Sequence, residues 1–530
     1  MSESISKCDV VIVGAGFAGL FALYRMRSLG LSAIVLEQGT DIGGTWFWNR
    51  YPGARCDVES LQYSYSFSDE VQREWSWSEK FASQAEILRY INFVADKFDL
   101  RGDIELSARV TSADYHESDS RWTVTTEAGQ VFDAQFLIFA TGPLSVPLVP
   151  DVPGLDTFKG DVYRTSTWPK HDVDLRGKRV AVLGTGSSGI QVIPAISGEV
   201  AELFVLQRTP NYVVPGYNGP MDPAYERDWK SHYAQRRAAA VRTRSNNLFA
   251  AGTIPGAQLS TEKRERDLEA SWRIGGLGFN YVFPDLSTDA DVNKHASDFV
   301  RRKIVEKVRD PEVAGRLLPT EYGFGGRRVC VDNGYYETFN RDNVTLVDLR
   351  AEPIETMTEY GFRTVAADYR IDTLILAAGF DAFTGALARI VIRGRHGITL
   401  RDKWRDGPLN YLGMAVSGFP NMFMIAGPGG PSVLSNVVIS VEQQVEWIAG
   451  CLKFMGDSGV GLIDARGEAE QKWCAHLSAL SAGKSISKTK SWYTGANVEG
   501  KSGRYLLYMG GTANYLDELR EHGYSGFDLA

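Results

Sequence analysis

Two glycine strings of the form GxGxxG could each bind the pyrophosphate of a dinucleotide. One occupies residues 14–19 behind the apolar residues 10–13, and the other occupies residues 184–189 behind residues 180–183. Glycines let the backbone turn tightly and approach a phosphate, and the helix that follows offers free N–H groups and its positive end. One such string is a weak signal, but two, each between an apolar strand and a helical stretch, predict two dinucleotide sites. Such a chain most simply moves electrons from one dinucleotide to the other.

The residues at the end of each second strand indicate which nucleotide each site prefers. Glu37 ends the strand expected at the first site, where an acid accepts hydrogen bonds from ribose hydroxyls and repels a 2′-phosphate. This predicts the adenosine half of FAD or NAD. Arg208 and Thr209 follow the corresponding strand of the second site and suit a 2′-phosphate, because a guanidinium pairs bidentately with phosphate oxygens. The second site therefore favours NADPH over NADH, with a solvated surface arginine as the alternative interpretation.

An unusually aromatic stretch, residues 43–57, follows the first glycine string. It contains Trp46, Trp48 and Tyr51 together with arginines and the carboxylate of Asp57. Aromatic runs usually belong to a core or an interface. The charged residues within this one indicate a lined pocket instead.

The elements that must position these residues alternate between strands and helices, which predicts an α/β fold with two Rossmann-like dinucleotide-binding domains. In the first unit we expect strands at 9–13 and 33–36 around a helix at 20–29. Charged, alanine-rich segments at 224–244 and 298–308 indicate a helical insertion. We therefore expect an FAD-binding domain split between residues 1–146 and 381–530, and an NADPH-binding domain at 147–380 that includes a helical subdomain at 218–326.

Composition excludes several other classes of function. The 530-residue chain is 44% hydrophobic and 23% charged with a net charge of −8, which suggests neither nucleic acid nor a membrane surface as a partner. The five cysteines form no CxxC motif and the seven histidines form no HxxxH pair, so we expect no metal. The N-terminus does not resemble a signal peptide, which makes the cytoplasm the default location. We expect a monomer or a weak homo-oligomer.

Two stretches carry a resemblance to the Baeyer–Villiger monooxygenases. Residues 43–57 resemble one signature of that family, with a GGxW start and a YPGxxxD end. Residues 158–169 nearly match a second signature, FxGxxxHxxxW followed by proline, and lie between the glycine strings as they do in the family. The length and order of parts are similar to the cyclohexanone monooxygenase branch. The resemblance extends over nearly the whole chain, through Arg327, Arg328, Trp492, Asn514 and Tyr515.

The resemblance implies an NADPH- and O2-dependent Baeyer–Villiger oxidation of ketones to esters or lactones. In that reaction NADPH reduces FAD, and the reduced flavin reacts with O2 to give a peroxide at flavin carbon 4a that attacks the ketone carbonyl. Residues that it assigns to cofactor binding are Gly14, Gly16, Phe17, Gly19, Glu37, Gly44, Thr45, Trp46, Asp57, Tyr63, Gly184, Thr185, Gly186, Ser187, Ser188, Gly189, Arg208, Thr209, Arg327, Arg328 and Trp492.

The resemblance also implies catalytic roles for Arg328, Asp57 and Trp492. Arg328 matches the family's catalytic arginine, and a fixed cation is the strongest stabiliser for negative charge that develops in a site closed to water. Asp57 matches the acid that contacts this arginine and limits the cost of burying it. Arg327 replaces a lysine that helps to hold the 2′-phosphate. Trp492 lies in a polar, small-residue segment between Gly483 and Gly500, whose composition suits a mobile lid over the cofactor.

Two positions depart from the family pattern. Arg164 stands where the second signature has histidine, and Ala378 replaces the threonine of a second ATG motif. Because arginine is larger and stays charged, we expect altered domain motion or coupling of NADPH use to product, not loss of chemistry.

Three alternatives share parts of this pattern. A flavin monooxygenase that oxidises nitrogen or sulfur uses the same cofactors, but Asp57, Arg328 and the two signatures favour ketones. A disulfide reductase shares the two-dinucleotide plan but needs a dithiol, which the cysteine spacing does not provide. An NADPH-sensing flavoprotein would keep the glycine strings without needing Arg328.

Overall fold

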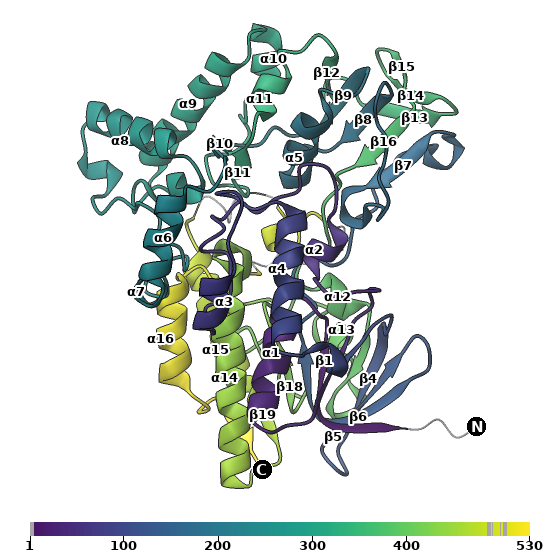
Figure 1. The fold of residues 1–530 in the computed structure, drawn as a ribbon, viewed down its shortest axis with the longest axis vertical. Coiled ribbons are helices and arrows are strands. Elements are labelled where there is room, and N and C mark those ends of the chain that lie inside the picture. The colour runs from purple at the N-terminus through teal and green to yellow at the C-terminus, as the bar shows by residue number, and fades with distance from the viewer. Residues whose placement is uncertain (1–4, 485–488, 490, 499, 502–505) are drawn as a thin grey trace.

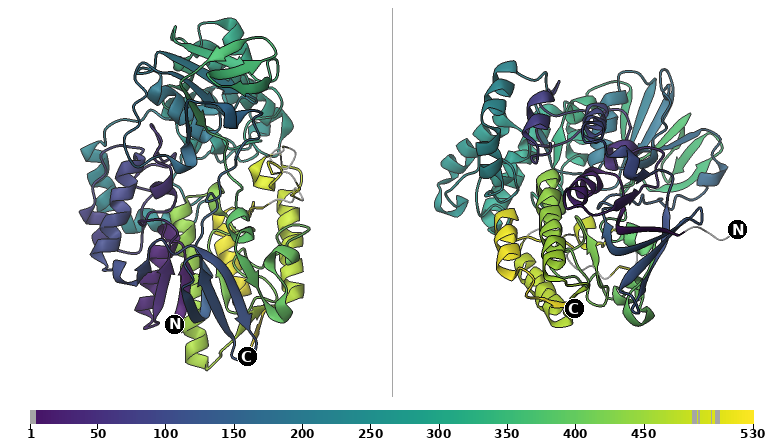
Figure 2. Two further views of the ribbon diagram at one scale, coloured as in Figure 1. Left: turned by 90° about the vertical axis from the view of Figure 1, so that its right-hand side faces the viewer. Right: turned by 60° about the horizontal axis from the view of Figure 1, so that its bottom comes forward.

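Two α/β parts stand one above the other in the computed structural model, with helices α8 and α9 beside the upper part and α6 and α7 lower, next to the lower part (Figure 1). The structure describes residues 5–484, 489, 491–498, 500–501 and 506–530. A view from the side shows the same division, with the teal and green segments above and most of the purple and yellow segments below (Figure 2). Each part has its own sheet, so each glycine string has its own parallel framework.

The lower sheet has eight strands, and its centre is parallel. Strand β1 pairs in parallel with β2 and with β6, and the β4-β5-β6 meander is antiparallel. Its order is β17 (Val391–Arg393), β4 (Val110–His116), β5 (Arg121–Thr126), β6 (Val131–Phe139), β1 (Ser6–Val13), β2 (Ala33–Leu36) and β3 (Ile104–Glu105), with β18 (Met422–Met424) on β6. Strands from both ends of the chain thus share one sheet, as the expected split domain requires. The exact domain limits remain a prediction.

Helix α1 (Phe17–Ser28) crosses from β1 to β2 and begins directly after the first glycine string. The expected start at residue 20 was therefore too late: residues 17–19 already form the first turn, because Gly16 in extended conformation serves as the N-cap. The helix carries buried side chains around most of its surface, since it lies between the sheet and α14 (Val437–Ser458). Because apolar residues lie around most of the helix, its sequence shows little amphipathic periodicity.

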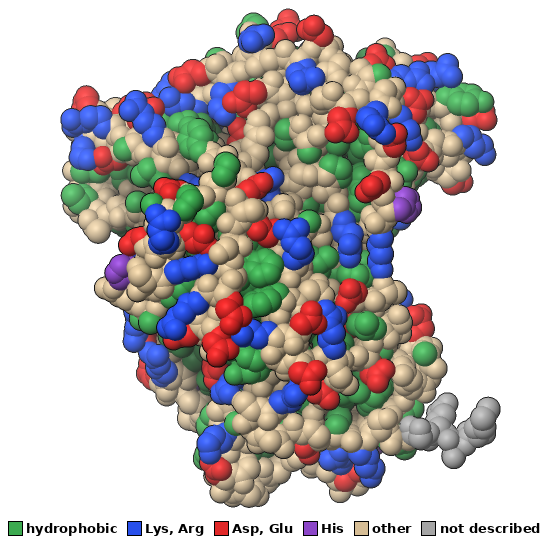
Figure 3. Space-filling model, viewed as in Figure 1, with side chains coloured by type: hydrophobic (Ala, Val, Ile, Leu, Met, Phe, Trp, Pro, Cys, Tyr) green, Lys and Arg blue, Asp and Glu red, His purple; other side chains and the backbone are tan. Residues whose placement is uncertain are grey.

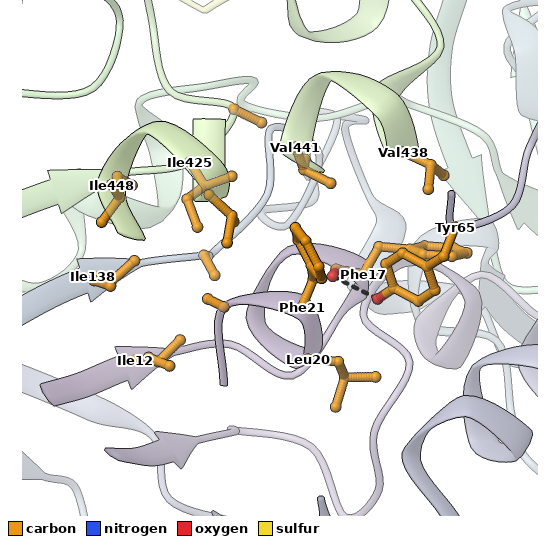
Figure 4. Packing of buried hydrophobic residues seen from close by; sticks show 14 of the residues in the cluster. Ile12, Phe17, Leu20, Phe21, Tyr65, Ile138, Ile425, Val438, Val441 and Ile448 are labelled. Carbon is orange, nitrogen blue, oxygen red and sulfur yellow. Dashed lines mark hydrogen bonds between the residues drawn. The ribbon is translucent and has the colours of Figure 1, made fainter. Parts of the chain in front are cut away.

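The core between these elements fixes the position of the glycine string. Phe21 of α1 and Val441 of α14 belong to one cluster of buried side chains with Ile138 of β6 and Ile425, which follows β18 (Figure 4). Full burial of such a side chain contributes about 1.5–3 kcal/mol. The hydroxyl of Tyr65 donates a 2.6 Å hydrogen bond to the carbonyl oxygen of Phe17, which fastens the first turn of α1. The start of α1 is therefore held from two sides.

The upper sheet has five parallel strands and is a second Rossmann-like unit. Its order is β12 (Val344–Asp348), β9 (Glu202–Gln207), β8 (Arg179–Leu183), β16 (Thr373–Leu376) and β7 (Asp161–Arg164). Helix α5 (Ser187–Ile196) follows β8, and α11 (Tyr335–Thr338) packs on α5. A small antiparallel sheet completes this part, with β13 (Ile354–Thr358), β14 (Gly361–Thr364) and β15 (Asp368–Arg370). The predicted α/β class with two parallel nucleotide-binding units is confirmed.

The expected helical insertion is present, with different boundaries. The predicted helix at 224–244 is two helices, because Ser231 and His232 turn their side chains back to the carbonyl oxygen of Asp228 and compete with the helical hydrogen bonds. The predicted helix at 298–308 begins earlier, at Ala290. The insertion comprises α6 (Pro223–Ser231), α7 (Tyr233–Ala240), α8 (Thr261–Ile274), α9 (Ala290–Lys307) and α10 (Pro311–Arg316). Strands β10 (Val213–Pro215) and β11 (Cys330–Asp332) pair where it leaves and rejoins the nucleotide unit.

The remaining elements surround the lower sheet. They are α2 (Thr45–Trp48), α3 (Asp69–Glu74), α4 (Gln84–Lys97), α12 (Gly385–Ala388), α13 (Leu400–Lys403), α15 (Gly467–Ser481), α16 (Thr512–His522), β19 (Ile463–Ala465) and β20 (Phe527–Leu529). Acidic and basic side chains are interspersed on the face drawn in Figure 3. Among the described residues, no helix is both long and apolar enough to cross a bilayer.

Candidate active site

The first glycine string forms a backbone turn in which a residue with a side chain would clash. Gly14 has φ +106°, and a Cβ there would lie 2.7 Å from the carbonyl oxygen of Ala140. A Cβ on Gly19 would lie 1.8 Å from the carbonyl oxygen of Gly14. No side chain caps the start of α1 at Gly16, so the first N–H groups of the helix point into the adjoining cavity. This cradle fits a pyrophosphate.

Glu37 stands at the end of β2, as expected, and is almost completely buried. Its carboxylate accepts hydrogen bonds from the backbone N–H groups of Ala15, at 2.8 Å, and Gly39, at 2.7 Å. Burial raises the pKa of Glu37, and the two N–H donors oppose that rise. The carboxylate is thus fixed beside the glycine turn, where it can accept hydrogen bonds from a ribose diol.

One cavity is lined by most of the predicted FAD-binding residues, although Gly19 and Asp57 are not among its lining residues. Gly16 and Gly44 lie side by side in its wall, since a Cβ on Gly44 would lie 3.0 Å from the Cα atom of Gly16. The Nε1–H group of Trp46 donates a 3.2 Å hydrogen bond to the hydroxyl oxygen of Tyr63. Lining residues include Gly14, Gly16, Phe17, Glu37, Gly44, Thr45, Trp46, Tyr63, Ala426, Val437 and Val441. The cavity runs from a phosphate cradle to an aromatic and aliphatic end, which fits FAD.

The second glycine string repeats the geometry of the first. Gly184 has φ +111°, and a Cβ there would lie 2.5 Å from the carbonyl oxygen of Ala377. A Cβ on Gly189 would lie 2.0 Å from the carbonyl oxygen of Gly184. Helix α5 begins at Ser187 and its N-cap residue, Gly186, makes no side-chain cap. A second phosphate cradle therefore lies at the carboxyl edge of the upper sheet, formed by Gly184, Thr185, Gly186, Ser187, Ser188 and Gly189.

Two of the residues predicted to bind a 2′-phosphate, Arg208 and Thr209, directly follow β9, and Arg327 is linked to the same segment through Tyr322. The hydroxyl of Thr185 donates to the carbonyl oxygen of Thr209 at 3.2 Å, which joins the glycine string to the segment after β9. Arg208 is exposed there. The guanidinium of Arg327 lies 5.1 Å from the ring centroid of Tyr322, whose hydroxyl donates to the carbonyl oxygen of Pro210 at 2.8 Å. Within the described part of the chain, Nε of Arg327 has no hydrogen-bond partner although it is buried.

Arg328 and Asp57 form the ion pair expected from the resemblance. Their Nη2 and Oδ2 atoms are 3.1 Å apart, and the Asp57 side chain is 7% exposed. Burial disfavours the charge of Arg328, but the neighbouring Asp57 more than compensates and raises the pKa of the guanidinium above its ordinary value. The Nη1 group of Arg328 also donates to the carbonyl oxygen of Val433 at 3.3 Å, just before α14. The cation is fixed and permanently charged.

Gln191 is a residue of this site that sequence reasoning missed. Its Nε2 group lies 3.4 Å from Oδ1 of Asp57, and its Oε1 atom accepts the hydroxyl hydrogen bond of Tyr51 at 2.8 Å. Gln191 belongs to α5, so the helix behind the second glycine string touches the carboxylate that orients Arg328. Its position two residues after the glycine string was the available signal.

Trp492 lies next to Tyr493, and Tyr493 is the residue of this segment that lies near Arg328. The Trp492 ring stacks on Phe383 with centroids 5.7 Å apart and an interplanar angle of 17°. The adjacent Tyr493 is buried, which raises its pKa to about 12, and nearby Arg328 opposes that rise. The predicted lid between Gly483 and Gly500 includes residues 485–488, 490 and 499, which lie outside the described residues. Its lid function stays a prediction.

Arg164 ends β7 and pairs in register with Leu376 of β16. Nε of Arg164 is buried without a partner among the residues that the structure describes. Ser166 and Thr167, from the same signature, line the FAD-type cavity. The second signature thus runs from the upper sheet to the lower cavity, as a connection between the two units. In the described residues, no cluster of histidine, cysteine and acidic side chains is arranged to hold a metal.

Curated relatives match the chain over nearly its full length. An acetone monooxygenase (methyl acetate-forming) from a Gordonia species is 40% identical over 99% of this chain and 100% of the relative. A Baeyer-Villiger monooxygenase from Pseudooceanicola batsensis is 40% identical over 98% and 95%. A phenazine N-monooxygenase from Lysobacter antibioticus is also 40% identical, over 98% and 97%.

Structural comparison gives the same assignment. An oxidised steroid monooxygenase bound to NADP superimposes with a TM-score of 0.95 at 44% identity and covers 99% of both chains. The sequence profile of a family described as pyridine nucleotide-disulphide oxidoreductase matches residues 11–242, which span both glycine strings. Cys8, Cys56, Cys330 and Cys451 form no disulfide, so this match reflects the nucleotide-binding plan. The fold, the paired cradles, the Arg328–Asp57 pair and the full-length relatives place this chain in the Baeyer–Villiger monooxygenase family.

Proposed function

We propose that this protein is an NADPH- and O2-dependent monooxygenase that converts ketones to esters or lactones. The observation that carries the proposal is the Arg328–Asp57 ion pair, which lies beside Tyr63 in the lining of the FAD-type cavity. Arg328 lies close enough to Tyr63, a lining residue, for its charge to oppose the rise that burial causes in the pKa of Tyr63. Bound FAD and NADPH supply the activation of oxygen.

The chain's own residues hold and stabilise the reacting groups. The two glycine strings fix the pyrophosphates, and Glu37 fixes one ribose. Arg328 faces the region where an oxygen atom acquires negative charge, and a preorganised cation in a water-poor site is worth several kcal/mol, roughly 3 to 4, in the transition state. Asp57 keeps the guanidinium in place and remains its counter-ion. Trp492, stacked on Phe383, covers the site on the side of the C-terminal segment.

The proposal also covers the domain limits, the location and the oligomeric state of the protein. We propose the FAD-binding domain at 1–146 and 381–530 and the NADPH-binding domain at 147–380, because strands from residues 6–139 and 391–424 share one sheet and strands from 161–376 share the other. A cytoplasmic monomer or weak homo-oligomer completes the proposal. Light scattering of the purified protein tests the oligomeric state.

A ketone panel tests the activity. Purified protein with FAD is given NADPH, 18O2 and acyclic, cyclic, aryl and steroid ketones, and products are identified by mass spectrometry. We expect an ester or lactone that carries one 18O atom with at least one ketone class. NADPH consumption that yields only hydrogen peroxide with every ketone would contradict the proposal and favour an NADPH-sensing flavoprotein.

A second candidate is N-oxidation of heteroaromatic substrates. It is favoured by the phenazine N-monooxygenase that is 40% identical over nearly the whole chain. Phenazines and pyridines therefore form one arm of the same panel. N-oxide formation that survives an Arg328→Ala substitution, while ester formation does not, would separate the two activities.

A further inference from the structure

Arg350 lies beside the residues expected to bind the 2′-phosphate, although no sequence motif marks it. Strand β12 pairs in parallel with β9, with Asp348 opposite Gln207. The ladder continues one step further, because the N–H group of Leu349 donates to the carbonyl oxygen of Gln207 at 2.8 Å. Arg350 and Arg208 therefore leave neighbouring strands at the same edge of the sheet.

The side chain of Arg350 turns toward this edge. Its Nη2 group donates to the hydroxyl of Thr209 at 3.1 Å and lies 2.7 Å from a carboxylate oxygen of Glu321. The exposed fraction is 35% for the Arg350 side chain and 54% for that of Glu321. A partly exposed pair of this kind has little net value for folding, so the contact does not explain the arginine by itself.

Two other arginines belong to segments at the same edge. Arg208 precedes Thr209 directly, and Arg327 lies over Tyr322, which hydrogen-bonds to the carbonyl oxygen of Pro210. Among the ion pairs between described residues, none involves Arg208 or Arg327, and the buried Nε of Arg327 is without a partner. Glu321 pairs with Arg350, and Asp348 accepts the backbone N–H group of Arg350 at 3.1 Å, so three guanidinium groups lie on segments that carry two carboxylates at this edge. An orphaned buried donor beside an excess of positive charge is what an anion site needs.

We infer that Arg350 is a third guanidinium contact to the 2′-phosphate of NADPH and a determinant of its preference over NADH. The inference rests on the proposed function. Thr209 orients Arg350 through its hydroxyl, and Glu321 holds the guanidinium at the edge of the site. A phosphate dianion offers more acceptor atoms and more charge than Glu321, so Arg350 turns from the carboxylate to the phosphate when the nucleotide binds.

Binding measurements on the FAD-loaded full chain test the inference without turnover. Dissociation constants for NADP+ and NAD+ are measured by titration calorimetry for the wild type, Arg350→Gln and Arg350→Lys. We expect Arg350→Gln to weaken NADP+ binding about tenfold, the loss typical of one charge-assisted contact. NAD+ binding should change by less than about twofold because NAD+ lacks the phosphate. Arg350→Lys should recover part of the affinity, since it keeps the charge without the fork.

Arg316→Gln is the matched control. Arg316 is a half-exposed arginine near the same edge: its backbone carbonyl accepts a hydrogen bond from Gln207, and its guanidinium lies 3.9 Å from Glu312. Like Arg350→Gln, the Arg316→Gln substitution removes one positive charge from this part of the surface. The inference fails if Arg350→Gln weakens NADP+ no more than Arg316→Gln does, or weakens NADP+ and NAD+ equally. A wild type that binds no NADP+ would instead overturn the proposed function and the inference with it.

Glu321→Gln gives an independent check. It removes the carboxylate that competes with the phosphate while keeping the side-chain shape. We expect NADP+ to bind more tightly and NAD+ to bind unchanged. Weaker NADP+ binding in this variant would show that Arg350 acts only in its pair with Glu321 and would overturn the inference.

Discussion

The guanidinium of Arg328 and the carboxylate of Asp57 lie 3.1 Å apart although 271 positions separate them in sequence. Asp57 comes from the aromatic stretch of the lower unit, and Arg328 comes from the segment that rejoins the upper unit. The pair therefore exists only when both units are docked. Removing one partner of a buried pair costs about 3–5 kcal/mol, because it leaves an uncompensated charge.

Substitution of Asp57 should impair product formation more than cofactor binding. In Asp57→Asn the guanidinium keeps a neighbour of the same shape but loses its counter-ion and its fixed orientation. We expect kcat/KM for the ketone to fall roughly 100-fold, the order seen when one electrostatic stabiliser is lost, with bound FAD retained. Initial rates of ester formation and the flavin absorbance measure the two effects. Unchanged ester formation would contradict the assigned role.

Gln191 should support the same ion pair from α5. Gln191→Leu removes the N–H donor to Asp57 and the acceptor of the Tyr51 hydroxyl. We expect about a tenfold loss in ketone turnover, since one buried hydrogen bond to a charged group contributes about 1.5–3 kcal/mol. Tyr51→Phe should lower turnover less. The double variant should resemble Gln191→Leu, because Tyr51 reaches Asp57 by way of its hydrogen bond to Gln191. Additive losses would show that Tyr51 and Gln191 act independently.

Gly14→Ala should abolish FAD binding. The position has φ +106°, and a Cβ would lie 2.7 Å from a backbone carbonyl oxygen. Relief of this clash must move β1 or the segment after β6, both of which line the cradle. Gly30→Ala is the control, because it also has positive φ, +77°, but nothing lies within 4 Å of the new Cβ. The ratio of flavin to protein absorbance should fall in the first variant only.

Glu442 should make stability depend on pH. Burial raises its pKa from the ordinary 4.5 to about 7, and hydrogen bonds from Ser66 and the charge of Arg237 oppose the rise. The folded state therefore binds more protons than the unfolded chain between these values. The contribution of this group to the free energy of unfolding is largest in acid and declines as pH rises toward 7, by about 3 kcal/mol in all.

Melting temperatures of Glu442→Gln and wild type at pH 5 and pH 8 measure this effect. We expect the variant to gain relative to the wild type at pH 8, where the buried carboxylate is charged. Glu446→Gln is the control on the same helix, since the Glu446 side chain is 50% exposed and pairs with Arg25 at the surface. An equal difference at both pH values for Glu442→Gln would contradict the assignment.

Arg164→His should alter the coupling of NADPH consumption to product. The imidazole is shorter than the guanidinium and leaves space at the end of β7, beside Leu376 and the connection to the lower unit. Looser docking of the two units should increase the NADPH consumed for each product molecule, by about twofold or more. The comparison of NADPH loss with product formed measures it. An unchanged ratio would show that the position does not govern coupling.

Local patterns were sufficient for both nucleotide cradles. A glycine string, the strand before it and the acid or arginine after the next strand depend on backbone sterics and charge within about 25 residues, so Gly14, Glu37, Gly184 and Arg208 could be placed from sequence. The helix limits were less accurate. The first turn of α1 depends on a glycine N-cap, and the break at His232 depends on side chains that hydrogen-bond to the backbone. Hydrophobic periodicity predicts neither feature.

The sequence by itself determined the fold class and the two cofactor cradles, and its family resemblance predicted roles for Asp57 and Arg328. Only the tertiary structure showed Gln191 bridging α5 to Asp57 and Arg350 facing Thr209. These contacts join segments that are far apart along the chain and that carry no motif of their own. Their proximity arises from strand order and domain docking, which are collective results of packing.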